Sequence, residues 1–105
     1  MLLDFTFPAD IWIYDGKGAW HFVTLPKPIS AQIKSLSGGR KTSQGMIPVT
    51  ATIGNTRWTT SIFRDTKRGA YLLALKASVR AKEKLRAGDK IEVALLISFE
   101  SEAKV

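Results

Sequence analysis

The sequence contains no cysteine and a single histidine, His21, and together these shortages remove several classes of site. Without cysteine there is no disulfide, no thiolate nucleophile and no zinc–thiolate centre. With one histidine there is no histidine-based metal cluster and no two-histidine acid–base pair. The carboxylates are scattered over predicted turns and strand faces. The sequence therefore predicts no catalytic residues, no metal site and no cofactor, and we expect a protein that is not an enzyme.

Long apolar runs are also missing. The longest, at 93–97, is far below the roughly 20 residues that a helix needs to cross a bilayer. No basic segment precedes an apolar stretch near the N-terminus, so we expect no secretory signal and no membrane partner. The lack of cysteine is in keeping with a cytoplasmic protein. A length of 105 residues predicts one domain spanning 1–105.

Acidic residues are few, and the basic excess is unevenly placed. The chain has 16 Lys and Arg against 9 Asp and Glu, a formal net charge of +7. Residues 57–90 hold ten of the basic residues and three of the acidic ones, which accounts for the whole excess. Such a region attracts polyanions, whereas a solvated surface that only keeps the protein soluble is the alternative interpretation. If the region binds nucleic acid, the predicted contacts are Arg64, Lys67, Arg68 and Lys84.

The remaining pattern predicts a mainly β protein. Residues 3–14 alternate between apolar and polar, which is typical of a half-buried strand. Turn signals at 15–18 and 54–55 each predict a hairpin. Short helices are expected near 29–36 and from Ser78, as an N-terminal cap, to Leu85; the segment 35–45 predicts a mobile loop. Six or seven mostly antiparallel short strands with two short helices predict a small β-barrel.

A repeat supports this architecture. Gly18-Ala19-Trp20 is echoed 51 positions later by Gly69-Ala70-Tyr71, and each copy leads through a strand and a helix to another strand. The sequence thus predicts an internal strand–helix–strand pseudo-duplication and a monomer or weak dimer. Aligned on this echo, the strands predict four barrel-filling residues in symmetry-related pairs: Trp20, Phe22, Tyr71 and Leu73.

Over nearly its whole length the chain resembles a bacterial family of uncharacterised proteins, domain of unknown function 1905 (DUF1905). The residues that carry the resemblance are Trp20, Phe22, Leu25-Pro26, Thr60-Ser61, Gly69, Tyr71-Leu72, Arg80, Gly88-Asp89 and Val93. The resemblance implies no known activity.

Each repeat is also similar to the swapped-hairpin unit of AbrB/MazE-type transcription factors. Residues 22–27 match the strand that ends in Leu-Pro-Lys, and residues 85–93 match the Gly-Asp-Lys segment that opens the following strand. This similarity implies a double-split β-barrel in which one chain supplies what two chains supply in those dimers. Fold does not settle function.

The leading functional hypothesis is a non-enzymatic barrel that binds an unknown ligand or protein partner. Lys76, Arg80 and Lys84 recur along one helical flank, and Trp58 is an aromatic residue beside Arg57, so the predicted ligand-binding residues are Lys76, Arg80, Trp58 and Arg57. Trp12 and Tyr14 lie on the polar face of the first strand and are further candidates for an exposed stacking surface. The alternative is a nucleic-acid-binding, AbrB-like protein that uses the basic region 57–90.

Overall fold

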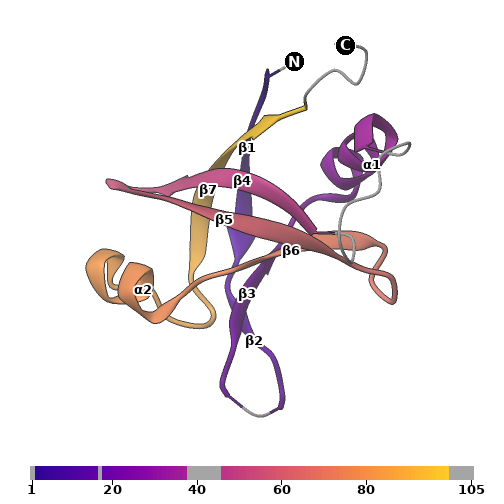
Figure 1. Ribbon diagram of the computed structural model, residues 1–105. Coiled ribbons are helices and arrows are strands. Elements are labelled where there is room, and N and C mark those ends of the chain that lie inside the picture. The colour runs from indigo at the N-terminus through magenta and orange to yellow at the C-terminus, as the bar shows by residue number, and fades with distance from the viewer. Residues whose placement is uncertain (1, 17, 38–45, 100–105) are drawn as a thin grey trace.

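The computed structural model describes residues 2–16, 18–37 and 46–99, and most of the loop predicted at 35–45 lies outside them. Its elements follow the order β1 (Leu2–Asp10), β2 (Trp12–Ile13), β3 (His21–Thr24), α1 (Lys27–Ser37), β4 (Met46–Ile53), β5 (Thr56–Asp65), β6 (Ala70–Ala74), α2 (Ala77–Glu83) and β7 (Lys90–Ser98). The predicted mainly β architecture with two short helices is confirmed (Figure 1).

The seven strands form one antiparallel sheet in the order β1-β7-β4-β5-β6-β3-β2. The first and last strands of this order are consecutive in the chain, separated by Ile11 alone, so the sheet curls round into a barrel-like shape (Figure 1). At this break the Ile11 N–H donates to the Asp89 carbonyl and the Gly88 N–H donates to the Ile11 carbonyl. The single strand predicted over 3–14 is therefore two strands.

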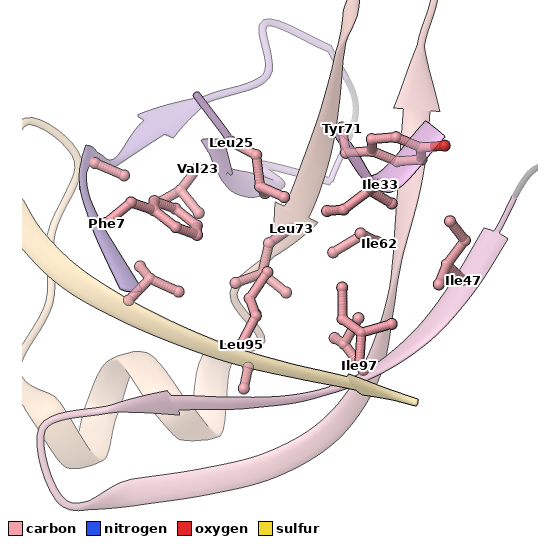
Figure 2. Close-up of a cluster of buried hydrophobic side chains, with 14 of the residues drawn as sticks. Phe7, Val23, Leu25, Ile33, Ile47, Ile62, Tyr71, Leu73, Leu95 and Ile97 are labelled. Carbon is pink, nitrogen blue, oxygen red and sulfur yellow. The ribbon is translucent and has the colours of Figure 1, made fainter. Parts of the chain in front are cut away.

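The core fills the inside of the curled sheet with mainly aliphatic side chains, joined by the aromatic rings of Phe7 and Tyr71 (Figure 2). Residues of β4 and β7 alternate between buried and more exposed positions, as period-two patterning dictates. The side chains that are shielded most completely from solvent are Val23, Ile33, Ala51, Ile62, Leu73, Val93 and Ile97.

The pseudo-duplication is present as β3-α1-β4 and β6-α2-β7, with the helices on opposite sides of the sheet (Figure 1). The two copies pair with each other, because β3 is antiparallel to β6 and β4 is antiparallel to β7. The Leu25 N–H donates to the Tyr71 carbonyl, and the Leu75 N–H donates to the His21 carbonyl. These reciprocal bonds make His21 equivalent to Tyr71 and Leu25 equivalent to Leu75, a separation of 50 positions (21 to 71, 25 to 75).

This register corrects the predicted core. The Gly-Ala echo is separated by 51 positions, so it misaligns β3 by one residue, and a slip of one residue moves every side chain to the other face of a sheet. Tyr71 and Leu73 do fill the barrel, and their equivalents on β3 are the half-buried His21 and the core residue Val23. Phe22 is buried outside the barrel core, and Trp20 is 57% exposed. The prediction that Trp20 and Phe22 fill the barrel is wrong.

Two side chains fasten the helices to the sheet. From α1, the buried Ser30 hydroxyl accepts the Tyr71 N–H at 3.0 Å. From α2, the Glu83 carboxylate accepts the Thr56 hydroxyl at 2.6 Å and the Asn55 N–H at 3.2 Å, both at the β4–β5 hairpin. The predicted Ser78 cap is wrong, since Lys76 occupies the N-cap position of α2 and forms no side-chain hydrogen bond there. The helix starts earlier than predicted because the pairing with β3 ends at Leu75, whose N–H donates to the His21 carbonyl.

Candidate ligand-binding groove

The outer face of the β2–β3 and β5–β6 hairpins carries a cluster of aromatic rings centred on Phe22. The centroid of Phe22 lies 5.2 Å from that of Trp12, 5.7 Å from Phe63, 6.3 Å from Trp20 and 6.5 Å from Tyr14. Trp20 stacks on Phe22 with an interplanar angle of 10°, whereas Phe63 and Tyr14 meet it edge to face. Both arrangements are favourable for aromatic pairs.

These rings enclose a groove of about 600 Å³, within the range of small-molecule sites. We call it the aromatic groove. Its lining combines aromatic, basic and polar side chains: Trp12, Tyr14, Trp20, Phe22, Phe63, Arg64, Asp65, Thr66, Lys67, Arg68 and Leu72.

The groove lies where the two structural copies meet. Phe22 on β3 and Leu72 on β6 are equivalent by the 50-residue register, and both point away from the barrel core into the groove. Trp12 is paired with Phe22, and Phe63 is paired with Leu72, so Trp12 and Phe63 are equivalent as well. The groove therefore straddles the pseudo-two-fold axis, with one aromatic pair and one apolar pair contributed symmetrically.

The copies differ in the turns of these hairpins. One residue, Ala70, lies between Gly69 and Tyr71, whereas two residues lie between Gly18 and the equivalent His21. Both glycines adopt positive φ, 67° at Gly69 and 88° at Gly18, a conformation that glycine accepts at little cost. By the 50-residue register Trp20 is equivalent to the buried Ala70, so the extra residue of the first hairpin is Ala19, which also adopts a positive φ of 47°. The indole at the rim of the groove therefore has no aromatic equivalent in the second copy.

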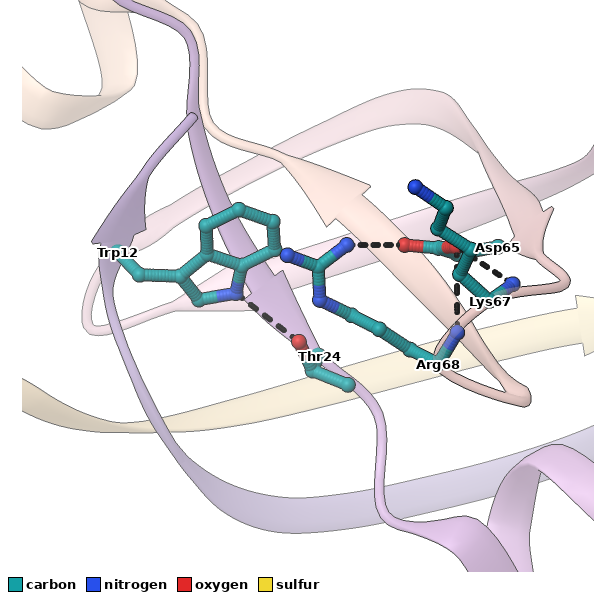
Figure 3. A network of polar contacts seen from close by, with 5 residues as sticks. All are labelled: Trp12, Thr24, Asp65, Lys67 and Arg68. Carbon is teal, nitrogen blue, oxygen red and sulfur yellow. Dashed lines mark hydrogen bonds and ion pairs between the residues drawn. The ribbon is translucent and has the colours of Figure 1, made fainter. Parts of the chain in front are cut away.

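Arg68 covers one wall of the groove (Figure 3). Its guanidinium carbon lies 4.4 Å from the centroid of Trp12, a cation–π contact. The guanidinium also forms an ion pair with Asp65. The Trp12 indole is held from the other side, since its Nε1–H donates to the Thr24 hydroxyl at 2.9 Å. The wall is thus an indole with a guanidinium over its ring, and each group is held by a further polar contact.

Asp65 organises the turn that carries these cations. One of its carboxylate oxygens accepts the Lys67 N–H at 3.0 Å and the Arg68 N–H at 3.3 Å. The hydrogen bond from the Arg68 side chain lowers the pKa of the Asp65 carboxyl, partial burial opposes this, and the backbone donors add to the lowering. Asp65 is therefore ionised at neutral pH, and its charge is already neutralised by Arg68.

Arg64 contributes a further cation. Its guanidinium carbon lies 6.0 Å from the centroid of Tyr71, and its Nε is buried without a hydrogen-bond partner among the described residues. Three basic side chains and one acidic side chain therefore line the groove, for a formal charge of +2.

The structure brings together three of the four predicted nucleic-acid contacts. Arg64, Lys67 and Arg68 all line the aromatic groove. Lys84 lies apart at the end of α2, where it is exposed and adopts a left-handed backbone conformation. The predicted stacking residues Trp12 and Tyr14 also lie in the groove.

The four residues predicted to bind a ligand do not form one site. Trp58 and Lys76 line a small hollow of about 190 Å³, together with Trp20. The Arg80 Nε–H donates to the Leu75 carbonyl at 3.0 Å, so this side chain fastens α2 to the preceding segment. Arg57 lines a different depression that also contains residues of β1, β4 and β7.

Sequence reasoning missed Trp20, Phe22, Phe63 and Leu72 as groove residues. The place of Phe22 outside the core could have been predicted from the hairpin turn at 15–18. This turn pairs Phe22 with Trp12, and directly paired residues lie on the same face of a sheet. No comparable signal brings Phe63 to the same place, since it depends on β3 and β6 being neighbours.

The described residues carry neither a metal cluster nor a membrane-spanning helix. No group of three or more His, Asp or Glu side chains in these parts of the chain is arranged to hold a metal ion. Among the helices that the structure describes, none has the length and apolar character to span a membrane.

Comparison with known proteins establishes the family. The model of the family described as domain of unknown function (DUF1905) matches residues 7–95, so the chain belongs to this family. The match covers every strand that lines the groove. A search of curated proteins finds no significant match.

Proposed function

We propose that this protein is a non-enzymatic binding domain whose aromatic groove takes a planar, negatively charged ligand of the nucleotide class. The observation that carries the proposal is the Arg68 guanidinium held 4.4 Å above the Trp12 ring, beside the exposed ring of Trp20. Aromatic faces stack on planar rings, and adjacent cations attract a phosphate.

The charge of the groove supports an anion rather than a cation as ligand. Among the described residues no carboxylate forms an ion pair with Arg64 or Lys67, whereas Asp65 is engaged by Arg68 and by two backbone N–H groups. A cationic ligand would have to compete with Arg68 for the one carboxylate of the lining. An anionic ligand meets two free cations instead.

The groove chemistry supports binding rather than catalysis. Asp65 is the one carboxylate among the lining residues, and its lowered pKa makes it a weak base at neutral pH. The lining holds no histidine and no serine to serve as a nucleophile or general base. We expect the domain to bind its ligand as a monomer or weak dimer, which light scattering tests.

Tryptophan fluorescence provides the direct test, because two of the three tryptophans line the groove. Titration with a nucleoside monophosphate is expected to quench the emission with saturation. Arg68→Ala removes a cation and releases Trp12, and the loss of a charge-assisted contact of about 1.5–3 kcal/mol predicts a Kd at least tenfold higher.

Arg57→Ala is the matched control, since it removes the same charge from a depression away from the groove. It is expected to leave the Kd unchanged. The proposal is refuted by a wild-type titration that shows no saturable quenching at millimolar ligand, or by equal effects of the two substitutions.

A further inference from the structure

A second, smaller cavity lies beside the aromatic groove and shares the Trp20 side chain with it. The hollow that we call the second hollow, of about 190 Å³, is lined by Trp20, Trp58, Thr60, Ala74, Leu75 and Lys76. Trp20 lines both cavities, so one indole forms the partition between them. With 57% of its surface exposed, Trp20 is accessible from the solvent as well.

Each cavity offers the same pair of chemical groups. The groove has Trp12 with Arg68, and the second hollow has Trp58 with the exposed Lys76. A surface that alternates aromatic faces with cations matches a chain in which planar bases alternate with phosphates. A mononucleotide needs one such unit only.

We propose that the groove and the second hollow bind consecutive nucleotides of one single-stranded nucleic acid, with the strand crossing Trp20 between them. This inference rests on the proposed function, since it assigns the groove to the first nucleotide. Lys76 contacts a phosphate of the second nucleotide, and Trp58 contacts its base. A duplex is a poor occupant, because its base faces are already stacked on one another and cannot stack on the indoles.

The test compares ligand lengths on the full chain. Thymidine monophosphate, dT10 and rU10 compete with a fluorescein-labelled dT10 in an anisotropy assay. A second stacked base contributes about 1–3 kcal/mol, so dT10 is expected to bind at least about fivefold more tightly than the mononucleotide. The dT10 and rU10 arms distinguish DNA from RNA as the preferred strand.

Lys76→Ala tests the contribution of the second hollow to binding. The Lys76 side chain is exposed, so its removal leaves the core intact. It is expected to weaken dT10 binding several-fold, to lower the log–log salt slope by about 0.7, and to leave mononucleotide binding unchanged. Lys84→Ala is the matched control, since Lys84 is an exposed lysine that lines neither cavity. Trp58→Leu, checked for folding by circular dichroism, is expected to weaken dT10 binding in the same selective way.

The outcomes separate the two proposals. If the mononucleotide binds but dT10 and rU10 gain nothing over it, the inference of a two-nucleotide track is overturned while the proposed function stands. If Lys76→Ala and Lys84→Ala weaken dT10 equally, the second hollow is not part of the track. If neither the mononucleotide nor the oligonucleotides bind, the proposed function itself fails.

Discussion

Replacing Phe22 by leucine tests whether the aromatic groove is an energetically coupled cluster. Phe22 is only 8% exposed and lies within 6.5 Å, centroid to centroid, of four other rings. Leucine keeps most of the apolar burial but removes the ring. Aromatic pairs contribute about 0.5–1.5 kcal/mol each beyond their buried area, and pairs that share one ring are not additive. We therefore expect an aromatic contribution of about 2 kcal/mol to the free energy of unfolding.

Phe7→Leu is the matched control for this experiment. Phe7 is 3% exposed in the barrel core, and no ring of the described chain pairs with it. Both substitutions lose similar burial, so the difference between them isolates the ring contacts. Urea denaturation followed by far-ultraviolet circular dichroism measures both, since the groove tryptophans would confound fluorescence. A cost for Phe7→Leu equal to or above that for Phe22→Leu refutes the reasoning.

Three further predictions concern the polar contacts. Ser30→Ala leaves the buried Tyr71 N–H without its acceptor and is expected to lower the free energy of unfolding by about 1–3 kcal/mol in urea denaturation, with Ser30→Thr as the rescuing variant. Glu83→Gln weakens the bonds to the β4–β5 hairpin and is expected to cost about 1 kcal/mol, seen as a lower melting temperature; no change refutes the contact. The pKa of Asp65 in the folded protein lies below the ordinary 3.8. The stabilising ion pair with Arg68 is therefore complete above pH 3.8 and is lost as the pH falls through the pKa of the folded state. Carbon-detected NMR titration of the carboxyl measures this pKa, and a midpoint above 3.8 contradicts the prediction.

Much of the fold could be predicted from the sequence, because alternation, turn residues and helix breaks are local signals. The Gly54-Asn55 hairpin and the strand from Lys90 onward are examples that the structure confirms. The faces of β3 could not be predicted from the repeat. The extra residue in the first hairpin can be recognised only when the pairing of β3 with β6 is known. A shift of one residue in that pairing moves Phe22 to the other face of the sheet.

The candidate site could be predicted only in part. Charge density in 57–90 pointed to Arg64 and Arg68, and alternation pointed to Trp12. Their meeting in one groove depends on sheet order, since residue 12 and residues 63–68 are far apart in the chain. Arg80 shows the opposite failure: its position beside basic neighbours suggested a ligand contact, but its Nε–H bonds to a backbone carbonyl.

The exposed indole of Trp20 also gives the groove a direction. Phe22 and Leu72, like Trp12 and Phe63, are exchanged by the pseudo-two-fold axis, so on their own they would favour two opposite orientations of a strand nearly equally. The counterpart of Trp20 across the axis is the buried Ala70, so the indole that borders the second hollow is present on one side only. A single strand bound here would therefore run with a fixed 5′-to-3′ polarity, and the one indole without an aromatic counterpart would set it.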